Sequence, residues 1–206
     1  AGDAIIPETA YTAADGANIG IFFNGLKSIV DDGTNVNDFQ DINRTTYPQW
    51  KATYLSNGGT ARALTQALMQ LLVNRCEIIS GKKITMLLTS YAQRDAYLNL
   101  LVSQKRFMAN KLDGGYEALE FNGKSLLIDV DCQDDRMYAL NEPSIERFGS
   151  LDLKFDEESG QILKQFDRAD VFEFYMKAYA NFGTRQCNAN GVLVDLDVDS
   201  NYLLAA

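Results

Sequence analysis

Residues 171–182, V-F-E-F-Y-M-K-A-Y-A-N-F, form a run with a two-residue period, and the fold of the chain depends most on this run. Successive side chains of a β-strand point to opposite faces of the sheet, so this alternation predicts a strand. Twelve extended residues span about 40 Å, roughly twice an ordinary strand. One face is expected to carry Phe172, Phe174, Met176, Ala178, Ala180 and Phe182, and the other Glu173, Tyr175, Lys177, Tyr179 and Asn181.

A second long element lies earlier in the chain and has a helical period. We expect a helix over residues 60–79, with Thr60 as its N-cap and Gly81 as its stop signal. Such a helix is about 30 Å long at 1.5 Å per residue. The expected buried face carries Ala61, Leu64, Leu68, Leu71, Leu72 and Ile79, and the expected wet face Arg62, Gln66, Gln70, Asn74 and Glu77.

The residues between these two elements predict an α/β layer. Residues 84–89 form a short apolar run that predicts a buried strand, and Ser90 with Gln93 predicts a capping box for a helix that follows. Asn122-Gly123 predicts a tight hairpin turn. Further strands are expected at 136–140, 151–155 and 192–198, whereas residues 1–35 are expected to be mostly irregular.

The composition argues against catalysis. The 206 residues include no histidine, and 28 acidic against 19 basic residues give a formal charge of −9. Without histidine, a Ser-His-Asp triad, a Cys-His pair and a His-rich zinc site are excluded. An acidic chain is also a poor dedicated nucleic-acid binder, since such binding rests on Lys and Arg. No apolar run approaches the roughly 20 residues that span a bilayer.

The cysteines and one glycine-rich turn offer only weak signals for chemistry. Cys76, Cys132 and Cys187 are odd in number and far apart, which favours reduced thiols over a disulfide framework. Cys76 is expected to be a small buried side chain, and the carboxylates around Cys132 are expected to raise its pKa. Gly58-Gly59-Thr60 before a helix suggests anion binding, but the lysine of a phosphate-binding loop is missing.

The acidic stretch D-V-D-C-Q-D-D, residues 129–135, is the one candidate metal site. Converging carboxylates suit hard cations such as calcium. The stretch lacks the central glycine and the final glutamate of an EF-hand loop. A solvated turn between two strands is therefore the preferred interpretation, and we expect no cofactor. The candidate ligands, should a cation bind, are Asp129, Asp131, Asp134 and Asp135.

Several charged and aromatic residues are candidates for contacts between subunits. The acidic turn at residues 156–158 could meet a basic patch on a neighbouring subunit, although most such runs are simply solvated. Lys105 and Arg106 could form such a patch or a solvated helix end. Trp50 is expected in a core or an interface rather than in a stacking platform for bases. The full set is Arg44, Trp50, Lys105, Arg106, Asp156, Glu157 and Glu158.

A series of segments, which includes the predicted long helix and the strand with M-Y-A-L-N (137–141), resembles in its order the major capsid protein of tailed double-stranded-DNA bacteriophages. No single motif is diagnostic; their order and spacing along most of the chain carry the resemblance. The other segments are F-N-G-L-K-S-I-V-D-D-G (23–33), N-R-T-T-Y-P-Q-W (43–50), K-K-I-T-M-L-L-T-S-Y-A-Q-R-D-A-Y (82–97), G-G-Y-E-A-L-E-F-N-G-K-S-L-L-I-D-V-D-C (114–132) and D-R-A-D-V-F-E-F-Y-M-K-A-Y-A-N-F-G-T (167–184).

The resemblance implies an α+β fold, the tailed-phage capsid fold. Its peripheral domain holds a long spine helix and long β-strands, and its axial domain is α/β. Residues 60–79 would match the spine helix and 168–184 a long peripheral strand. Members usually carry an N-terminal arm and a β-hairpin loop before this region, so a chain that starts at Ala1 is expected to be trimmed. The implied division is 1–35 as an irregular N-terminal segment, 36–81 and 146–187 as the peripheral domain, and 82–145 and 188–206 as the axial domain.

The implied function is structural, not enzymatic. The subunit would associate with itself into hexamers and pentamers of an icosahedral phage head that encloses double-stranded DNA without gripping it. Portal, scaffold or decoration proteins could join it, and no membrane is involved. It would be assembled in the cytoplasm of a host bacterium and end in the virion capsid. The alternatives are an encapsulin-type nanocompartment shell and, remotely, an acidic metal-dependent α/β enzyme.

Overall fold

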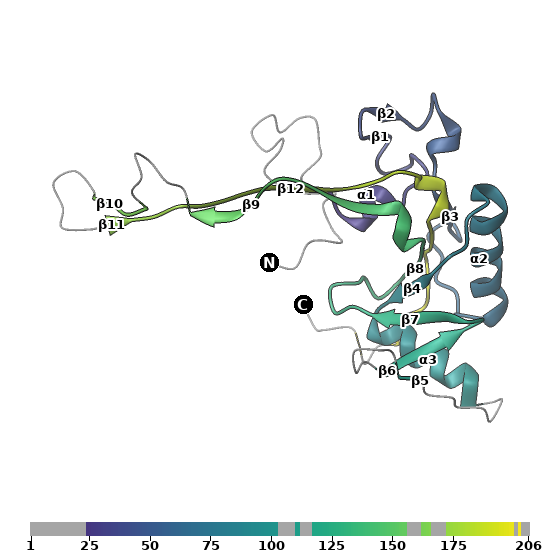
Figure 1. Ribbon diagram of the computed structural model, residues 1–206. Helices are drawn as coiled ribbons and strands as arrows, with labels where there is room; N and C mark the ends of the chain where they lie inside the picture. The colour runs from purple at the N-terminus through teal and green to yellow at the C-terminus, as the bar shows by residue number, and fades with distance from the viewer. Residues whose placement is uncertain are drawn as a thin grey trace.

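A computed structural model describes residues 24–102, 110–111, 117–155, 162–165, 172–199 and 202 of the chain. They form a body built on one mixed sheet and a long two-stranded ribbon that extends away from it (Figure 1). The helix α2 (Gln66–Ser80) lies at the right edge of the body, and the ribbon leaves the body to the left. The long helix is present as α2. The strand predicted over 171–182 is confirmed only in part, because the chain forms the short β11 (Phe172–Glu173) and the nine-residue β12 (Met176–Thr184) instead of one continuous strand.

The body is organised around a seven-stranded sheet that mixes parallel and antiparallel pairs. The pairs β13–β3 and β4–β7 are parallel, and the other neighbouring pairs are antiparallel. Such a mixture, with helices between strands, is an α+β arrangement. The strand order is β3 (Thr53–Leu55), β13 (Gly191–Leu193), β8 (Met137–Leu140), β4 (Met86–Thr89), β7 (Lys124–Ile128), β6 (Glu117–Phe121) and β5 (Asn110–Lys111).

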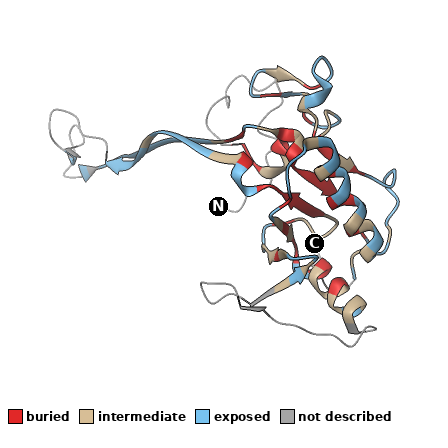
Figure 2. Cartoon of the chain, turned by 45° about the vertical axis from the view of Figure 1, so that its right-hand side comes forward, coloured by how far each residue is buried: buried red, intermediate tan, exposed pale blue. Residues whose placement is uncertain are grey.

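The central strands of this sheet are buried on both faces. In β8, Met137 and Ala139 belong to one apolar cluster, whereas Tyr138 and Leu140 belong to a second. Alternate residues of a strand face opposite sides, so the two clusters lie on the two faces of the sheet. Helices α2 and α3 cover the first face, and the N-terminal residues of the described chain cover the second. Figure 2 shows this buried centre in red.

Helix α2 begins five residues later than predicted. Its N-cap is Thr65, whose hydroxyl accepts a hydrogen bond from Leu68 N at 3.2 Å, and not Thr60. Residues before it are held extended, because Arg62 forms a β-bridge with Leu196. The predicted end is confirmed: Gly81 is left-handed, with φ 66°, and donates to Glu77 O. The start of α2 is therefore set by the bridge between Arg62 and Leu196, which are distant in the sequence, whereas its end is set locally by Gly81.

The buried side of α2 also differs from the prediction. Met69, Leu72, Val73 and Cys76 pack into the first cluster, whereas Leu71 and Ile79 of the predicted buried face are exposed. Gly191 of β13 sets this contact, since a Cβ there would lie 3.1 Å from Leu72 Cδ1 and collide with Cys76 Sγ. At this close approach Cys76, a small side chain, is the α2 residue nearest to Gly191.

Helix α3 (Tyr91–Val102) forms where predicted, but without the predicted capping box. The Ser90 hydroxyl is buried and has no hydrogen-bond partner among the described residues. The Gln93 side chain instead donates to Asp134 O and Asp197 O, both at 2.8 Å. Gln93 therefore ties α3 to two distant segments rather than to its own first turn.

The hairpin β6–β7 confirms the Asn122-Gly123 prediction. Asn122 and Gly123 have φ of 52° and 71°, which is the left-handed pair that a two-residue hairpin turn requires. The strand predicted at 136–140 is confirmed as β8. The buried strand predicted at 84–89 is confirmed as β4, which begins at Met86.

The described residues before β3 form a small lobe of short elements. Only 24–35 of the segment expected to be irregular are described, and they contain the four-residue helix α1 (Leu26–Ile29). The remaining elements of the lobe are β1 (Asp38–Phe39), β2 (Ile42–Asn43) and the 3-10 turn η2 (Pro48–Trp50).

The two-domain division stays a prediction, although α2 and β3, assigned to one domain, share a core with β4 and β8 of the other.

The ribbon and the short elements around it complete the described chain. The remaining elements are η3 (Glu142–Ser144), β9 (Ile145–Phe155), β10 (Lys164–Gln165), β11 (Phe172–Glu173), β12 (Met176–Thr184) and η4 (Cys187–Ala189).

Candidate assembly interface

The ribbon consists of strands β9 and β12, paired antiparallel over their length. The register runs from Met176 opposite Phe155 to Thr184 opposite Ile145. It shifts twice, between Lys177 and Tyr179 and between Tyr179 and Ala180, with the extra residues on β9. Such bulges bend a strand pair and increase its twist. The ribbon is therefore a shaped arm, not a flat strand pair.

Large apolar side chains are exposed on both faces of the ribbon. Phe155 lies opposite Met176 and contacts Phe174 edge to face at 5.8 Å between ring centroids, so these three share one face. Phe148 lies opposite Asn181, and Tyr179, two residues before Asn181, shares that other face. All five are exposed. Exposed apolar side chains gathered on a surface mark contact sites, and an isolated strand pair is marginally stable in water.

The base of the ribbon is anchored firmly in the body. The Thr184 hydroxyl and Arg185 N donate to Ser144 O at 2.8 and 2.9 Å. Asn24 N donates to Asn181 Oδ1 at 2.8 Å. A Cβ on Gly183 would collide with the Gln40 amide, so the β1–β2 turn packs directly on the strand there. The ribbon is therefore fixed to the body at its base, and the rest of it is exposed.

A second surface with exposed apolar side chains lies on the outer face of α2, where Leu71 and Ile78 flank the exposed Arg75. Ile78 is 81% exposed, and it lies two turns after Leu71 on the side opposite the core. A helix with apolar residues on both sides is ordinarily buried on both. Ile79, which was predicted to be buried, lies two turns after the buried Leu72 and is 56% exposed near the end of the helix.

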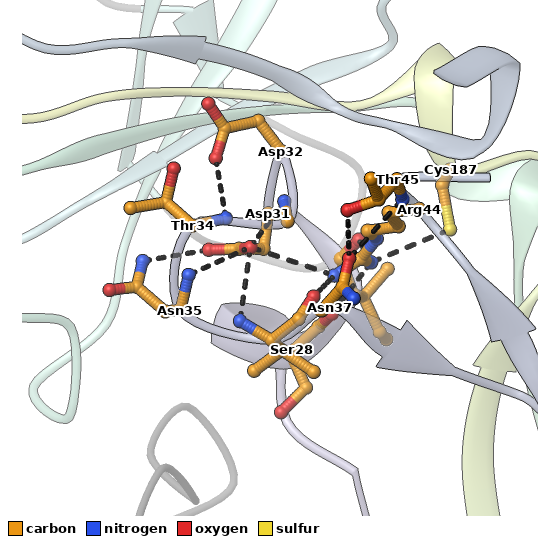
Figure 3. Close-up of polar contacts among 12 residues, drawn as sticks. Ser28, Asp31, Asp32, Thr34, Asn35, Asn37, Arg44, Thr45 and Cys187 are labelled. Atoms are coloured by element: carbon orange, nitrogen blue, oxygen red, sulfur yellow. Dashed lines mark hydrogen bonds and ion pairs between the residues drawn. The ribbon is translucent and has the colours of Figure 1, made fainter. Parts of the chain in front are cut away.

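Arg44, predicted at a subunit interface, lies inside its own subunit and is 0% exposed. Its Nη1 donates to Val36 O at 2.7 Å, and its Nη2 donates to Ser28 O at 2.8 Å and Ile29 O at 2.9 Å (Figure 3). Ser28 and Ile29 end helix α1, whose last carbonyls have no partner within the helix. The interface assignment of Arg44 is therefore wrong, because its guanidinium closes the end of α1.

The carboxylate of Asp31 completes this buried centre. Its Oδ1 accepts hydrogen bonds from Gly33 N at 2.7 Å and Val36 N at 3.2 Å, and lies 3.8 Å from Arg44 Nη1 (Figure 3). Arg44 Nη2 also lies 3.8 Å from Cys187 Sγ. Burial raises the pKa of the Cys187 thiol to about 11, against the lowering effect of Arg44. Arg44 thus links the N-terminal lobe to η4 through Cys187, while Asp31 balances its charge within the lobe.

The other predicted interface residues remain proposals. Trp50 is half-buried against the second apolar cluster, and its Nε1 is buried without a hydrogen-bond partner among the described residues. Lys105 and Arg106 lie outside the described residues, as does the acidic turn of Asp156, Glu157 and Glu158.

The acidic loop at 129–135 makes local contacts. Asp129 Oδ1 accepts from Asp131 N at 2.9 Å, and Asp135 pairs with Arg136 at 2.9 Å. In the part of the chain that the structure describes, no three Cys, Asp or Glu side chains gather into a group able to hold a metal ion. Burial, and next the charge of Asp129, raise the pKa of Cys132 to about 12. The metal interpretation, with Asp134 as its fourth ligand, gains no support from these contacts.

The glycine-rich turn before α2 does bind an anion, which is this chain's own Asp195. Asp195 Oδ2 accepts from Ser56 Oγ at 2.8 Å, Asn57 N at 2.6 Å and Gly59 N at 3.1 Å. Burial acts to raise the pKa of Asp195, but these donors outweigh it and lower the pKa below its ordinary value. With φ 60°, Asp195 also ends the strand predicted over 192–198, so β13 stops at Leu193.

This chain matches known proteins by its fold but not by its sequence. No protein-family model matches the chain, and no curated protein matches it. Solved structures do match. A subunit of the cyanophage A-1(L) capsid aligns with a TM-score of 0.63 and 19% identity, over 92% of this chain and 64% of that one. The chain has the phage-capsid fold. The predicted α+β fold class is thereby confirmed.

Two further capsid-like shells match with lower scores. The capsid of an empty GTA particle aligns with a TM-score of 0.56 and 12% identity, over 92% of this chain and 61% of that one. The holo-SrpI encapsulin complex of Synechococcus elongatus PCC 7942 gives 0.53 and 12%, over 78% and 57%. The chain therefore spans between 57% and 64% of the length of these proteins. Among the described residues, no helix is both long and apolar enough to cross a bilayer.

Proposed function

We propose that this chain is a structural subunit that assembles with copies of itself into the shell of a tailed-phage head. Hexamers and pentamers would tile an icosahedral particle around double-stranded DNA, assembled in the host cytoplasm and retained in the virion. The observation that carries the proposal is the β9–β12 ribbon, which has a fixed root and apolar side chains exposed on both faces. The capsid fold supports it.

The charge balance favours a wall that encloses DNA without gripping it. A net charge of −9 supplies few cations for the phosphate contacts on which nucleic-acid affinity rests. Portal, scaffold and decoration proteins are compatible partners in such a shell. The role is structural rather than catalytic, and the proposal needs no metal or cofactor.

The test compares assembly of the wild-type protein with that of a ribbon variant, Leu153→Ser with Phe174→Ser. These side chains are 64% and 56% exposed, so the folded subunit should tolerate the change. Their loss from an interface costs about 2–3 kcal/mol, which raises the subunit concentration needed for assembly roughly 30- to 150-fold. The matched control is Asp152→Ser, a polar neighbour on the same strand.

Sedimentation and negative-stain microscopy measure the outcome. Shells from the wild type and the control, with unassembled but folded double variant, support the proposal. Absence of wild-type shells, or equal assembly of all three, contradicts it.

An encapsulin-type compartment is the second candidate, supported by the match to an encapsulin shell. The phage-type match covers more of the chain, 92% against 78%. Nuclease-protected DNA within particles isolated from their source favours the phage head, whereas protein cargo favours the compartment.

A further inference from the structure

The sequence contains four Asn-Gly pairs, and the structure gives them very different surroundings. They are Asn24-Gly25, Asn57-Gly58, Asn122-Gly123 and Asn190-Gly191. Such a pair can lose ammonia spontaneously, because glycine has no side chain to shield its backbone nitrogen from the asparagine amide before it. The nitrogen reaches that amide only when the asparagine rotates about its Cα–C bond. A pair that packing or hydrogen bonds hold in place therefore reacts slowly.

Two of the pairs are held in the interior. Asn24 and Asn190 are both buried. The Asn190 side chain accepts a hydrogen bond from Asn141 N at 2.9 Å and donates one to Ser144 Oγ at 3.0 Å. Gly191 lies in β13, where an added Cβ would collide with α2. Rotation at this peptide requires the core to open.

The pair Asn57-Gly58 is exposed, but its own loop holds both reacting groups. The Asn57 side-chain amide donates to Thr60 O at 2.8 Å. Gly58 N, the nitrogen that would attack, donates to Ser56 Oγ at 2.9 Å. Asn57 N also donates to Asp195 Oδ2 at 2.6 Å, which fixes the start of the loop.

The pair Asn122-Gly123 is exposed at the tip of the β6–β7 hairpin and is held by little. Nothing lies within 4 Å of the position that a Cβ on Gly123 would take. Gly123 N has no hydrogen-bond partner among the residues that the structure describes. The Asn122 amide donates to Gln70 Oε1 on α2 at 3.3 Å, which is long for such a bond.

We propose that Asn122 is a site of spontaneous deamidation in the folded subunit and reacts faster than the other three Asn-Gly pairs. Gly123 N loses its proton and bonds to Asn122 Cγ, while the Cγ–Nδ2 bond breaks and ammonia carries the proton away. Water then opens the succinimide ring at either carbonyl, which leaves aspartate or isoaspartate. This inference is independent of the proposed function.

The reaction alters the contact between the hairpin and α2. Neither product keeps the Nδ2 donor of Asn122, so the hydrogen bond to Gln70 Oε1 is lost and a carboxylate faces that oxygen. Isoaspartate also adds a methylene group to the main chain. The two-residue turn depends on the left-handed pair at Asn122 and Gly123, with φ of 52° and 71°, and cannot keep this geometry with a longer chain.

Peptide mapping of the aged protein tests the selectivity. The folded wild-type chain is kept at mildly alkaline pH, which promotes loss of the glycine N–H proton, and is then digested after lysine and arginine. Each Asn-Gly pair falls in a different peptide, and that of Asn122 spans residues 112–124. Mass spectrometry measures the deamidated fraction of each peptide. The same incubation in urea gives the rates that local sequence alone sets.

In the folded chain, we expect Asn122 to react at least about tenfold faster than Asn24 and Asn190, because a core segment opens at a much greater free-energy cost than an exposed turn. Asn57 should also react more slowly than Asn122, and the four rates should become similar in urea. Equal rates at Asn122 and Asn190 in the folded chain, or a faster reaction at Asn57, overturn the proposal.

The variant Asn122→Gln provides the matched control. It keeps a side-chain amide at the turn, but its longer side chain must close a six-membered ring, which forms far more slowly. This change should remove most of the ammonia that the folded chain releases. An unchanged release of ammonia from the variant contradicts the assignment of Asn122 as the main site.

Discussion

Replacing Arg44 by methionine should destabilise the unassembled subunit more than the loss of an exposed charged side chain does. The guanidinium is fully buried and donates to three main-chain carbonyls at 2.7, 2.8 and 2.9 Å. Methionine fills much of the same volume but donates nothing. The carbonyls at the end of α1 then lose their partner, and the Asp31 carboxylate stays buried without its cation.

The expected loss is about 3–5 kcal/mol, the usual cost of removing one partner of a buried ion pair. This is a large part of a typical stability of about 5–15 kcal/mol. With a denaturant slope of about 2 kcal/mol per molar urea, the unfolding midpoint falls by roughly 1.5–2.5 M. Arg44→Lys keeps the charge but not the planar array of donors, and should fall between wild type and Arg44→Met.

Urea unfolding followed by circular dichroism measures the effect. The control is Arg147→Met, whose Nη2 lies 3.2 Å from Asp152 Oδ1 in an ion pair with side chains 50% and 89% exposed. Exposed pairs contribute less than about 1 kcal/mol, so its midpoint should move by less than about 0.5 M. Equal midpoints for Arg44→Met and Arg147→Met would contradict this account, since burial would then have made no difference.

Three further perturbations probe other contacts of the body. Asp195→Asn weakens the acceptor of Ser56, Asn57 and Gly59 and should cost about 1 kcal/mol at neutral pH. Because the folded-state pKa of Asp195 is lowered, the contribution of its charge is present above the ordinary value of 3.8 and is lost as the pH falls through the lowered pKa. Urea midpoints of wild type and variant should therefore converge as the pH falls through the lowered pKa of Asp195, and a gap that stays constant with pH argues against a role for the charge. Gly191→Ala places a methyl group 3.1 Å from Leu72 Cδ1 and against Cys76, which should cost about 1–3 kcal/mol. Its melting temperature should fall by about 2–4 °C per kcal/mol, and an unchanged melting curve would show that α2 can move away. Burial raises the pKa of Cys76 and Cys187 to about 11 and that of Cys132 to about 12. None should react with Ellman's reagent in the folded subunit at mildly alkaline pH, and all three should react in urea; prompt labelling of the folded protein contradicts their burial.

Signals carried by a few neighbouring residues predicted local structure well. Asn122-Gly123 turns the β6–β7 hairpin, and Gly81 ends α2, because both positions need a left-handed backbone. The start and the phase of α2 were predicted wrongly. Arg62 is held by a bridge to Leu196, and Gly191 selects which side of the helix meets the sheet. Neither contact has a signal within the helix itself.

The candidate interface was predicted only in part for the same reason. Alternation predicts a long strand over residues 171–182, and the structure forms β12 from Met176 onward. Only the structure shows that Tyr179 and Phe148 are exposed on an arm that leaves the body. Arg44 shows the converse error. An arginine is expected at the surface, but this one is buried because it binds main-chain carbonyls that lie eight to sixteen residues away in the sequence.

Composition and short-range patterns along the chain were enough to exclude histidine chemistry, to establish the acidic charge, to locate the hairpin turn and to reveal the ordered series of segments that resembles a capsid protein. Each of these depends on residue counts or on residues close together in the sequence. Which apolar side chains are covered became clear only in the folded chain. Burial depends on what packs against a residue from elsewhere in the fold, so tertiary contacts alone could leave Ile78 on the surface and place Arg44 in the interior.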